Sequence, residues 1–576
     1  MNGDDKLVQF GLLPDKNLID VCDITDLNKL YDGICPQEFD TSICIQHCND
    51  FKMSNLPNYI NGNLIILNSD TAEDTVFSSL AQQHNEVNDI FNNLIGINGS
   101  LYILGTSHTK ISGFNKLEYI LGDLVIANNS NLILLPTFSS LLTVGQKQND
   151  SATRSGRIII ANNLSLKKIV GFEVLKQVGS GIFVMDNANL RDICGFINLL
   201  RTNEIVITQN PLLSSIFGFC YIRIIQQNLY IACNNEKSNN NNMTIDAFHF
   251  LETVGTMSIK NNTKLVKLHF KKIAKINDGL YIIENNLLNE IDLSTLMFAG
   301  NIVIQNNNAL TIMHFRTLQE INGELVIMNN SQLSSLGTFN NVKFINNGIL
   351  IIGNDCLKSI KGLSLLEFVG SKVYHLDGPE PDNNQCLTND WPAIFPPNCE
   401  DNGSGIFNYF VPVNTKIPHK FAHDICKVKF TNCSKWLVPD SNPVAMEQIN
   451  VGIMIYNNQH LASIESFHLL GDIGGHIYIV KNICLDVICA FEKIDHLLDL
   501  YIRNNPMLRV IKGFNEVQTA RDIIVTETIR LELFHGLRKL KHAQHLYLQS
   551  IHVDSIIGAD RGNKLVAGLL LYHKKS

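Results

Sequence analysis

A short apolar triplet followed by an asparagine recurs along most of this 576-residue chain, and this repeat constrains the fold more than any other feature. In the copy GELVIMNNSQLSSLGTF, at residues 323–339, the triplet Leu325-Val326-Ile327 runs into two asparagines and then into apolar residues three apart. Most copies follow one another after 22 to 24 residues, and longer steps contain insertions. The triplets begin at Leu101, Leu124, Ile158, Ile182, Ile205, Leu229, Met257, Leu280, Ile302, Leu325 and Ile349, and again at Ile453, Ile477, Leu500, Ile523 and Leu546. Self-similarity at such a period predicts a solenoid.

The triplet has the pattern of a short strand with one buried face. Strand side chains alternate, so the first and third residues of each triplet share a face. Three residues cannot bury that face alone, but stacked copies can. The three-residue apolar steps that follow mark further sides of each coil. The sequence therefore predicts an all-β solenoid, of the β-helix or leucine-rich-repeat-like kind, with coils of about 23 residues in two blocks.

An asparagine column accompanies the strands, five residues after most of the triplets begin. Its members are Asn129, Asn163, Asn187, Asn210, Asn234, Asn262, Asn285, Asn307, Asn330, Asn354, Asn458, Asn482 and Asn505. An inward amide has donors and an acceptor for the backbone groups that a corner leaves open. We expect these residues to be structural and the preceding residue, often also Asn, to be an exposed turn residue that tolerates left-handed geometry. N-x-S/T sequons are about as frequent as such an Asn-rich chain gives by chance.

A Gly-Phe pair follows the column in many copies, as in IVGF, ICGF, IFGF and IKGF. The glycine can take a positive φ at a corner without steric cost. The phenylalanines are expected to stack ring over ring inside the solenoid.

Composition and charge exclude several partners. The net charge of −8 and the pI near 6.1 argue against a nucleic-acid partner, and we find no Lys/Arg cluster interleaved with aromatics. No apolar run reaches the roughly 20 residues of a membrane span. The start, MNGDDKLVQFGLLPDKN, lacks the pattern of a signal peptide.

The phrase LxIxxNxxLxxIxGFxxLxxV resembles the receptor L-domain, the solenoid of insulin-receptor and EGF-receptor ectodomains, including L-domain proteins of the kind nematodes encode. The resemblance covers roughly residues 56–400 and 430–550. The stretch NNQCLTNDWPAIFPPNC is similar to the family's closing coil, with Cys386, Trp391 and Cys399 in the matching structural roles. The resemblance implies a right-handed β-solenoid, a secreted or cell-surface glycoprotein with disulfides, and ligand recognition. The chain departs from the family in lacking a cysteine-rich furin-like module and a kinase domain.

Four segments follow from the repeat and the cysteines. Residues 1–50 form a Cys-containing N-terminal cap, and 51–400 a long L-domain-like solenoid that could be two L domains joined near 145–157. Residues 401–430 form a linker, and 431–576 a second L-domain-like solenoid.

No catalytic or metal site is expected. The middle residues of the triplets point outward, and none is charged, whereas a β-helix hydrolase or lyase needs carboxylates or bases together on that face. We find no cysteine and histidine spacing typical of a metal site, and we predict no cofactor.

The outward middle residues are instead apolar and often aromatic. This favours a ligand-binding face with aromatic anchors, because interfaces are enriched in Tyr. The predicted ligand-binding residues are Tyr102, Phe183, Tyr230, Tyr281, Tyr478 and Tyr501. The alternative is that these residues reflect β-propensity, or are covered by loops.

The sequence thus predicts a non-enzymatic, receptor-type recognition protein that binds a peptide or protein ligand, or a membrane receptor. A structural or matrix-like scaffold is the alternative. A β-helix carbohydrate-active enzyme is a remote one.

The closing coil gives a testable prediction. Cys386 and Cys399 flank Trp391 where the first block of repeats stops, so we expect them to be disulfide-bonded. Peptide mapping of non-reduced, secreted protein should recover the linked pair; two free thiols in that material would contradict the assignment.

Overall fold

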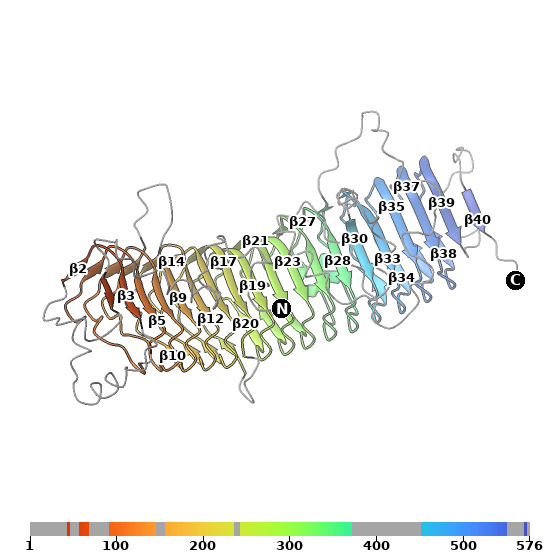
Figure 1. The fold of residues 1–576 in the computed structure, drawn as a ribbon. Helices are drawn as coiled ribbons and strands as arrows, with labels where there is room; N and C mark the ends of the chain where they lie inside the picture. The colour runs from red at the N-terminus through yellow and green to blue at the C-terminus, as the bar shows by residue number, and fades with distance from the viewer. Residues whose placement is uncertain are drawn as a thin grey trace, which may run out of the picture. The chain divides into compact units, whose positions relative to one another are not determined.

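The computed structural model describes residues 43–45, 57–67, 91–106, 108–145, 156–235, 242–370, 451–549 and 569–572. Within these residues the chain is all-β: short parallel strands are joined by turns, and the helical elements are two 3-10 turns, η3 (Gly337–Phe339) and η4 (Lys361–Leu363). The predicted all-β solenoid is confirmed (Figure 1). The chain divides into an N-terminal unit, Leu12–Leu296 with Asn307–His314, and a C-terminal unit, Met297–Asn306 with Phe315–Ser576.

The apolar triplets of the N-terminal unit form one side of its coils, here called the face strands. Each pairs in parallel with the equivalent residues of the next coil, as Ile182 does with Ile205. The face strands are β1 (Ile43–Ile45), β3 (Leu64–Leu67), β5 (Leu101–Leu104), β7 (Leu124–Ala127), β9 (Arg157–Ala161), β12 (Gly181–Met185), β15 (Glu204–Thr208), β17 (Ile224–Ala232), β19 (Thr253–Lys260) and β21 (Lys275–Ile283).

Two- and three-residue strands form the other sides of these coils. One side begins just before the face strands, with β2 (Tyr59–Ile60), β4 (Gly96–Ile97), β6 (Tyr119–Ile120), β8 (Thr143–Val144), β11 (Gln177–Val178) and β14 (Arg201–Thr202). The side after the asparagine column holds β10 (Lys168–Ile169), β13 (Asp192–Ile193), β16 (Ser215–Ile216), β18 (Thr244–Ile245), β20 (Lys267–His269), β22 (Glu290–Asp292) and β24 (Ile312–His314).

The C-terminal unit repeats this cross-section. Its face strands are β23 (Phe298–Gln305), β26 (Leu325–Met328), β28 (Ile349–Ile352), β30 (Val451–Tyr456), β33 (His476–Val480), β35 (His496–Arg503), β37 (Thr519–Thr526), β39 (His542–Gln549) and β40 (Leu569–Tyr572). The other sides hold β25 (Glu320–Ile321), β27 (Phe344–Ile345), β29 (Phe368–Val369) and β32 (Asp472–Ile473), and β31 (Ser463–Ile464), β34 (Val487–Cys489), β36 (Val510–Lys512) and β38 (Leu533–His535).

Strand β28 pairs directly with β30, Ile349 opposite Ile453, although more than a hundred residues separate them. In the N-terminal unit, β7 likewise pairs with β9 on either side of the insertion at 145–157. Coils therefore stack in register across long insertions. The predicted linker at 401–430 and closing coil lie outside the described residues, so the division into segments stays a prediction.

Phenylalanines fill the inside of most described coils at one corner. In the N-terminal unit the rings of Phe172, Phe196 and Phe219 lie 4.9 and 5.0 Å apart and almost parallel. In the C-terminal unit Phe467 and Phe491 stack at 5.1 Å. All five side chains are fully buried, so successive rings contribute an apolar column, in which Leu293 and Leu363 take the place of the ring in their coils.

The asparagine column joins each coil to its neighbours. Asn187 Nδ2 donates to Ile160 O of the preceding coil at 2.9 Å and to Met185 O of its own coil at 2.9 Å. Its backbone N–H donates to Asn210 Oδ1 of the next coil at 3.2 Å. Asn187 is fully buried, so a wrong residue here would leave several backbone groups unmet.

The residue before each column asparagine takes a left-handed backbone conformation. Examples are Asn128 at φ 58°, Asn162 at 53° and Asn329 at 54°. The Gly-Phe corners are more varied than expected. Gly171 has a φ of 99°, as expected, but in the copy ending Gly218-Phe219 it is Phe219, at 58°, that takes the positive φ. Its N–H donates to Phe196 O at 3.2 Å and its ring is buried in the column, which offsets the strain.

Adjacent asparagines in one coil should differ sharply in their effect on stability. Asn330 Nδ2 donates to Ile304 O at 2.8 Å and Met328 O at 3.1 Å, whereas Asn329 is partly buried and bonds Asn306 Oδ1. We expect Asn330→Ala to cost about 3 kcal/mol in the free energy of unfolding, since buried carbonyls lose their donor. Asn329→Ala should cost about 1 kcal/mol through left-handed strain, and Asn329→Gly less. Urea melts of the three variants measure this, and equal losses would contradict it.

Candidate functional site

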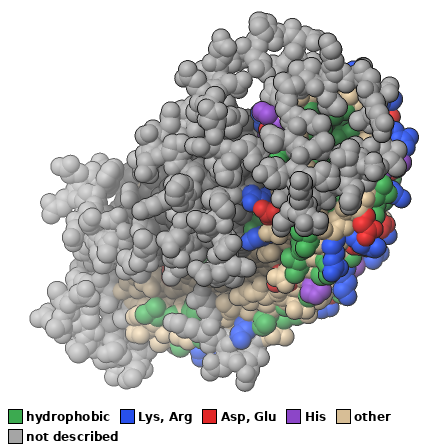
Figure 2. All heavy atoms as spheres, turned by 90° about the vertical axis from the view of Figure 1, so that its right-hand side faces the viewer, with side chains coloured by type: hydrophobic (Ala, Val, Ile, Leu, Met, Phe, Trp, Pro, Cys, Tyr) green, Lys and Arg blue, Asp and Glu red, His purple; other side chains and the backbone are tan. Residues whose placement is uncertain are grey.

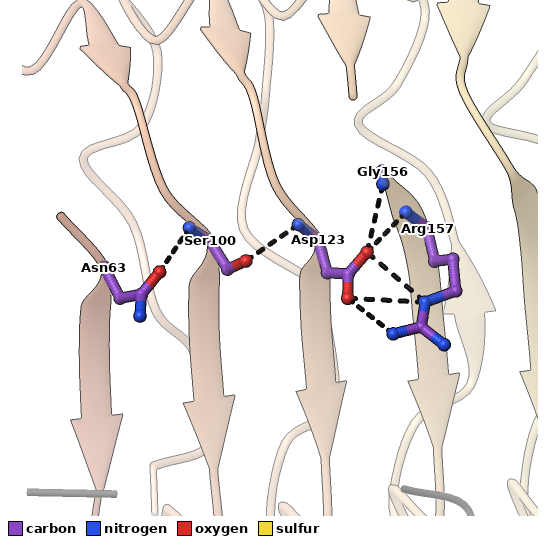
Figure 3. Close-up of polar contacts among 5 residues, drawn as sticks. All are labelled: Asn63, Ser100, Asp123, Gly156 and Arg157. Atoms are coloured by element: carbon purple, nitrogen blue, oxygen red, sulfur yellow. Dashed lines mark hydrogen bonds and ion pairs between the residues drawn. The ribbon is translucent and has the colours of Figure 1, made fainter. Parts of the chain in front are cut away.

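A ladder of polar side chains runs along the start of the first face strands, on the outer side of the sheet (Figure 3). Asn63 Oδ1 accepts the Ser100 N–H at 2.7 Å, and Ser100 Oγ accepts the Asp123 N–H at 2.9 Å. Asp123 Oδ1 accepts the N–H groups of Arg157 at 2.8 Å and Gly156 at 3.2 Å. Each side chain thus satisfies a backbone donor of the next coil.

Asp123 and Arg157 also form an ion pair within this ladder, with Arg157 Nη2 at 2.8 Å from Asp123 Oδ2 (Figure 3). The pair is partly accessible, with side-chain exposures of 21% for Arg157 and 13% for Asp123. Tyr102 lies two residues after Ser100 and therefore on the same face. Burial raises the pKa of Tyr102, the hydrogen bond with Ser100 lowers it, and Asp123 raises it further. We call Tyr102, Ser100, Asp123 and Arg157 the N-terminal face cluster.

The expected exposed aromatic stripe needs correction. Tyr102 is half-buried, but the other predicted ligand-binding residues are buried: the relative exposures are 1% for Phe183, 3% for Tyr230, 4% for Tyr281 and Tyr478, and 7% for Tyr501. These side chains point to the outer side of the sheet, as predicted from the alternation, but they are not free surface. Their role in ligand binding stays a prediction.

Glycines two residues earlier explain part of this burial. A Cβ placed on Gly279 would meet the Tyr281 ring at 2.6 Å, and one on Gly181 would meet the Phe183 ring at 2.9 Å. The rings therefore lie down over the glycine positions rather than standing away from the sheet. Tyr478 and Tyr501 stack on each other at 5.0 Å and 9°, because in-register strands place them side by side.

Two glutamates occupy the outer face at the same position as Asp123. Glu204 is 2% exposed and accepts a hydrogen bond from Asn228 Nδ2 at 2.6 Å; burial raises its pKa to about 7. Glu324 is fully buried, and burial raises its pKa well above the usual value. Its two carboxyl oxygens have no hydrogen-bond partner in the structure. Both groups are therefore expected to be largely protonated at mildly acidic pH.

A larger ionic group lies on the outer face of the C-terminal unit. Asp499 lies 2.7 Å from His476 Nδ1 and accepts from Arg521 Nε at 2.8 Å. Burial would raise the pKa of Asp499, but the hydrogen bonds from His476 and Arg521 outweigh it and lower the pKa. Asp522, the next residue along the sheet, lies 2.8 Å from His545 Nδ1 and accepts from the Tyr501 hydroxyl at 3.3 Å. Asp499 is thus paired with the charged Arg521, and Asp522 is held by a hydroxyl and an imidazole.

Elsewhere, charges meet across adjacent coils at the surface. Arg509 Nε lies 2.6 Å from Asp486 Oδ1, and Lys539 Nζ lies 2.6 Å from Glu516 Oε2. Figure 2 shows basic and acidic side chains lying next to one another on the described surface. Such exposed pairs set charge complementarity between coils and contribute little stability individually.

Sequence reasoning missed these charged residues because it considered only the middle residue of each triplet. The residue immediately before the triplet shares the outer face, and it is polar in many copies: Asn63, Ser100, Asp123, Arg157, Glu204, Asn228, Asn301, Glu324, His476, Asp499 and Asp522. The polar residue before the triplet was therefore the signal from which these charged residues could have been predicted. Which of these residues pair, and which are left buried alone, depends on packing.

The remaining predicted site residues fall into two groups. The column asparagines Asn129, Asn163, Asn187, Asn210, Asn330, Asn458 and Asn505 are all fully buried. Cys386, Trp391 and Cys399 lie outside the described residues. Across the part of the chain that the structure describes, no group of three or more His, Cys, Asp or Glu could hold a metal ion.

Comparison with known proteins relates part of this chain to a protein family. Residues 58–170 match the family model described as Receptor L domain, which confirms the resemblance for the segment that carries the N-terminal face cluster. No curated protein matches the chain. Among solved structures, the chain gives 9% identity and a TM-score of 0.13 to a structure titled "Crystal structure of TLR13-ssRNA13 complex", over 80% of this chain and 82% of that one. A likeness this weak carries no argument.

The buried acid Glu324 should make stability depend on pH. Because its pKa is raised above the usual 4.5, the folded state keeps a proton that the unfolded state releases. The stability is full below pH 4.5 and falls as the pH rises toward the folded pKa, by about 1.4 kcal/mol per pH unit. Glu324→Gln removes this loss, so between pH 4 and pH 9 the variant should match the wild type at the acid end and exceed it at higher pH, by a difference that stops growing above the folded pKa.

Melting temperatures of both proteins across this pH range provide the measurement. Glu532→Gln, an exposed change in the same unit, is the matched control and should track the wild type. A pH-independent difference for Glu324→Gln would show that the carboxyl is not held neutral by burial.

Proposed function

We propose that the protein is a receptor-type recognition protein that binds a peptide or protein ligand without catalysis. The observation that carries this proposal is the Receptor L domain match over residues 58–170. It falls on coils whose outer sheet face bears an aromatic residue beside a partly accessible ion pair, Tyr102 with Asp123 and Arg157.

The N-terminal face cluster has the chemistry of a recognition surface. A tyrosine offers a rigid ring and a hydroxyl at low entropic cost, and the ion pair offers a charged acceptor and a charged donor close together. Parallel strands present such groups at a constant step of about 4.8 Å, which suits a ligand that lies across the coils. Contacts of the ligand with the predicted aromatic residues are part of this proposal.

The arrangement of charge favours binding over catalysis. A general base needs a carboxylate that can take up a proton, but Asp123 already accepts two backbone N–H groups and a guanidinium. Asp499 is engaged in the same way by Arg521 and His476. These groups orient structure and ligand rather than move protons.

The family also supports a location outside the cell, on the surface or secreted. None of the helices in the described residues is long and apolar enough to cross a membrane. The alternative of a structural scaffold would use the same solenoid as a spacer, without a specific ligand.

The proposed function predicts that Tyr102 is a ligand contact. The chain, expressed through a secretory pathway and immobilised, would be used to select ligands from a displayed library of secreted proteins and peptides. Tyr102→Ala should weaken the affinity for the selected ligand at least about tenfold, since a half-buried aromatic contact typically contributes more than 1 kcal/mol to binding. Tyr59→Ala, at a 52% exposed tyrosine on another side of the coils, should leave affinity unchanged. If no ligand is selected, or both variants bind as the wild type does, the scaffold alternative stands instead.

A further inference from the structure

A lysine-rich coil stands out on this acidic chain. Residues 260–275 read KNNTKLVKLHFKKIAK, with six lysines in a protein whose net charge is −8. Lys267, Lys271, Lys272 and Lys275 are exposed. Lys271 and Lys272 occupy one corner of the coil, directly after the buried Phe270.

An open cavity of about 290 Å³ lies beside this corner, in the N-terminal unit. Its lining includes Asn242, Thr244, His249, Lys267, His269 and Lys271. These groups belong to two successive coils, those of β18 and β20, so stacking places hydrogen-bonding amide, hydroxyl and imidazole groups next to two ammonium groups.

Charge in and around the cavity is unevenly balanced. Lys267 Nζ is paired with Glu290 Oε2 at 2.6 Å, and His249 Nε2 with Asp246 Oδ1 at 2.9 Å. Among the described residues, Lys271 has no carboxylate partner within ion-pair distance. Its ammonium is therefore available to an anionic group of a ligand.

Two stacked aromatic rings and a lysine lie close to the cavity along the chain and across coils. Tyr221 and Phe250 belong to successive coils and stack at 5.5 Å and 16°. Lys272 Nζ lies over the Phe250 ring, 4.3 Å from its centre. Tyr221 is 48% exposed at the end of this stack. The aromatic stack and the cavity are adjacent along the chain, because Phe250 follows the lining residue His249 and Lys272 follows the lining residue Lys271.

We propose that this corner binds an anionic glycan, a sulfated or uronate-containing oligosaccharide. An exposed ring such as Tyr221 accepts the apolar face of a sugar, lysines pair with its sulfate or carboxylate groups, and the polar side chains of the cavity lining hydrogen-bond its hydroxyls. Asp246 in the lining and Glu290, paired with Lys267, disfavour the closely spaced phosphates of a nucleic acid. This site is separate in sequence and composition from the N-terminal face cluster.

The test uses the full chain and a heparin hexasaccharide as the probe, with binding measured by calorimetry at low and moderate salt. The double variant Lys271→Gln/Lys272→Gln should lose at least about tenfold in affinity and show a weaker salt dependence. Lys167→Gln/Lys176→Gln removes the same charge from exposed positions in the same unit and should bind as the wild type does. Tyr221→Ala should bind the hexasaccharide severalfold more weakly than the wild type, and Tyr59→Ala should bind it as the wild type does.

The comparison probes decide the chemical class. Fully desulfated heparin should bind much more weakly than the sulfated probe, and a short single-stranded DNA and a polyglutamate peptide should bind more weakly still. Protection of Lys271 and Lys272 from acetylation by the bound hexasaccharide reports the site in the unmodified protein. Equal loss in both lysine double variants, equal binding of DNA or polyglutamate, an unchanged Tyr221→Ala variant, or unprotected lysines would each overturn the proposal.

Discussion

The hydrogen bonds of the buried asparagine, present in most described coils, are the interaction on which the rest of the structure depends. Its amide donates to a carbonyl of its own coil and to one of the preceding coil, and its oxygen accepts an N–H of that preceding coil, as Asn482 does with Val480, Ile455 and Asn458. Without this side chain, backbone N–H and C=O groups at the buried corner would have no hydrogen-bond partners. The side chain thus ends the strand, turns the chain and fixes the stacking distance. The same contact joins Asn354 to Asn458, so a long insertion does not interrupt the ladder.

Fixed stacking has a consequence for the outer face of the sheet. Equivalent residues of successive coils are held side by side, so a polar residue at the start of a face strand either meets the next backbone N–H, as Ser100 does, or meets a neighbouring charge, as Asp499 does. The Glu324 carboxyl meets neither, and burial raises its pKa well above the usual value. Aromatic residues on this face pack against glycines and against one another. Charge and an aromatic group stay partly accessible together at Tyr102 and the Asp123–Arg157 pair, within the segment that matches the L-domain model, and the proposed recognition surface is built on them.

Stacking also creates sites from residues that are far apart in the sequence. Tyr221, Phe250 and Lys272 are separated by 29 and 22 positions yet form one contact series at a corner. The six lysines of residues 260–275 form a basic cluster that is visible in the sequence, contrary to the sequence prediction, but the stacked rings of Tyr221 and Phe250 come from other coils. In a solenoid, the relevant neighbours are one coil away.

The sequence by itself determined the coil. The apolar triplet, the asparagine five residues after its start and the phenylalanine corner each have one low-energy arrangement, in which apolar residues face inward and corner amides are bonded. The L-domain resemblance was also visible in these residues. Only the tertiary structure decided the state of the outer face. Alternation predicts that Phe183 and Tyr281 point outward, but whether they are exposed depends on the glycines beneath them and on their neighbours across coils. In the same way, the pKa of Glu204 and the pairing of Asp499 with Arg521 follow from burial and register. These are properties of packing between coils, and no single copy of the repeat contains them.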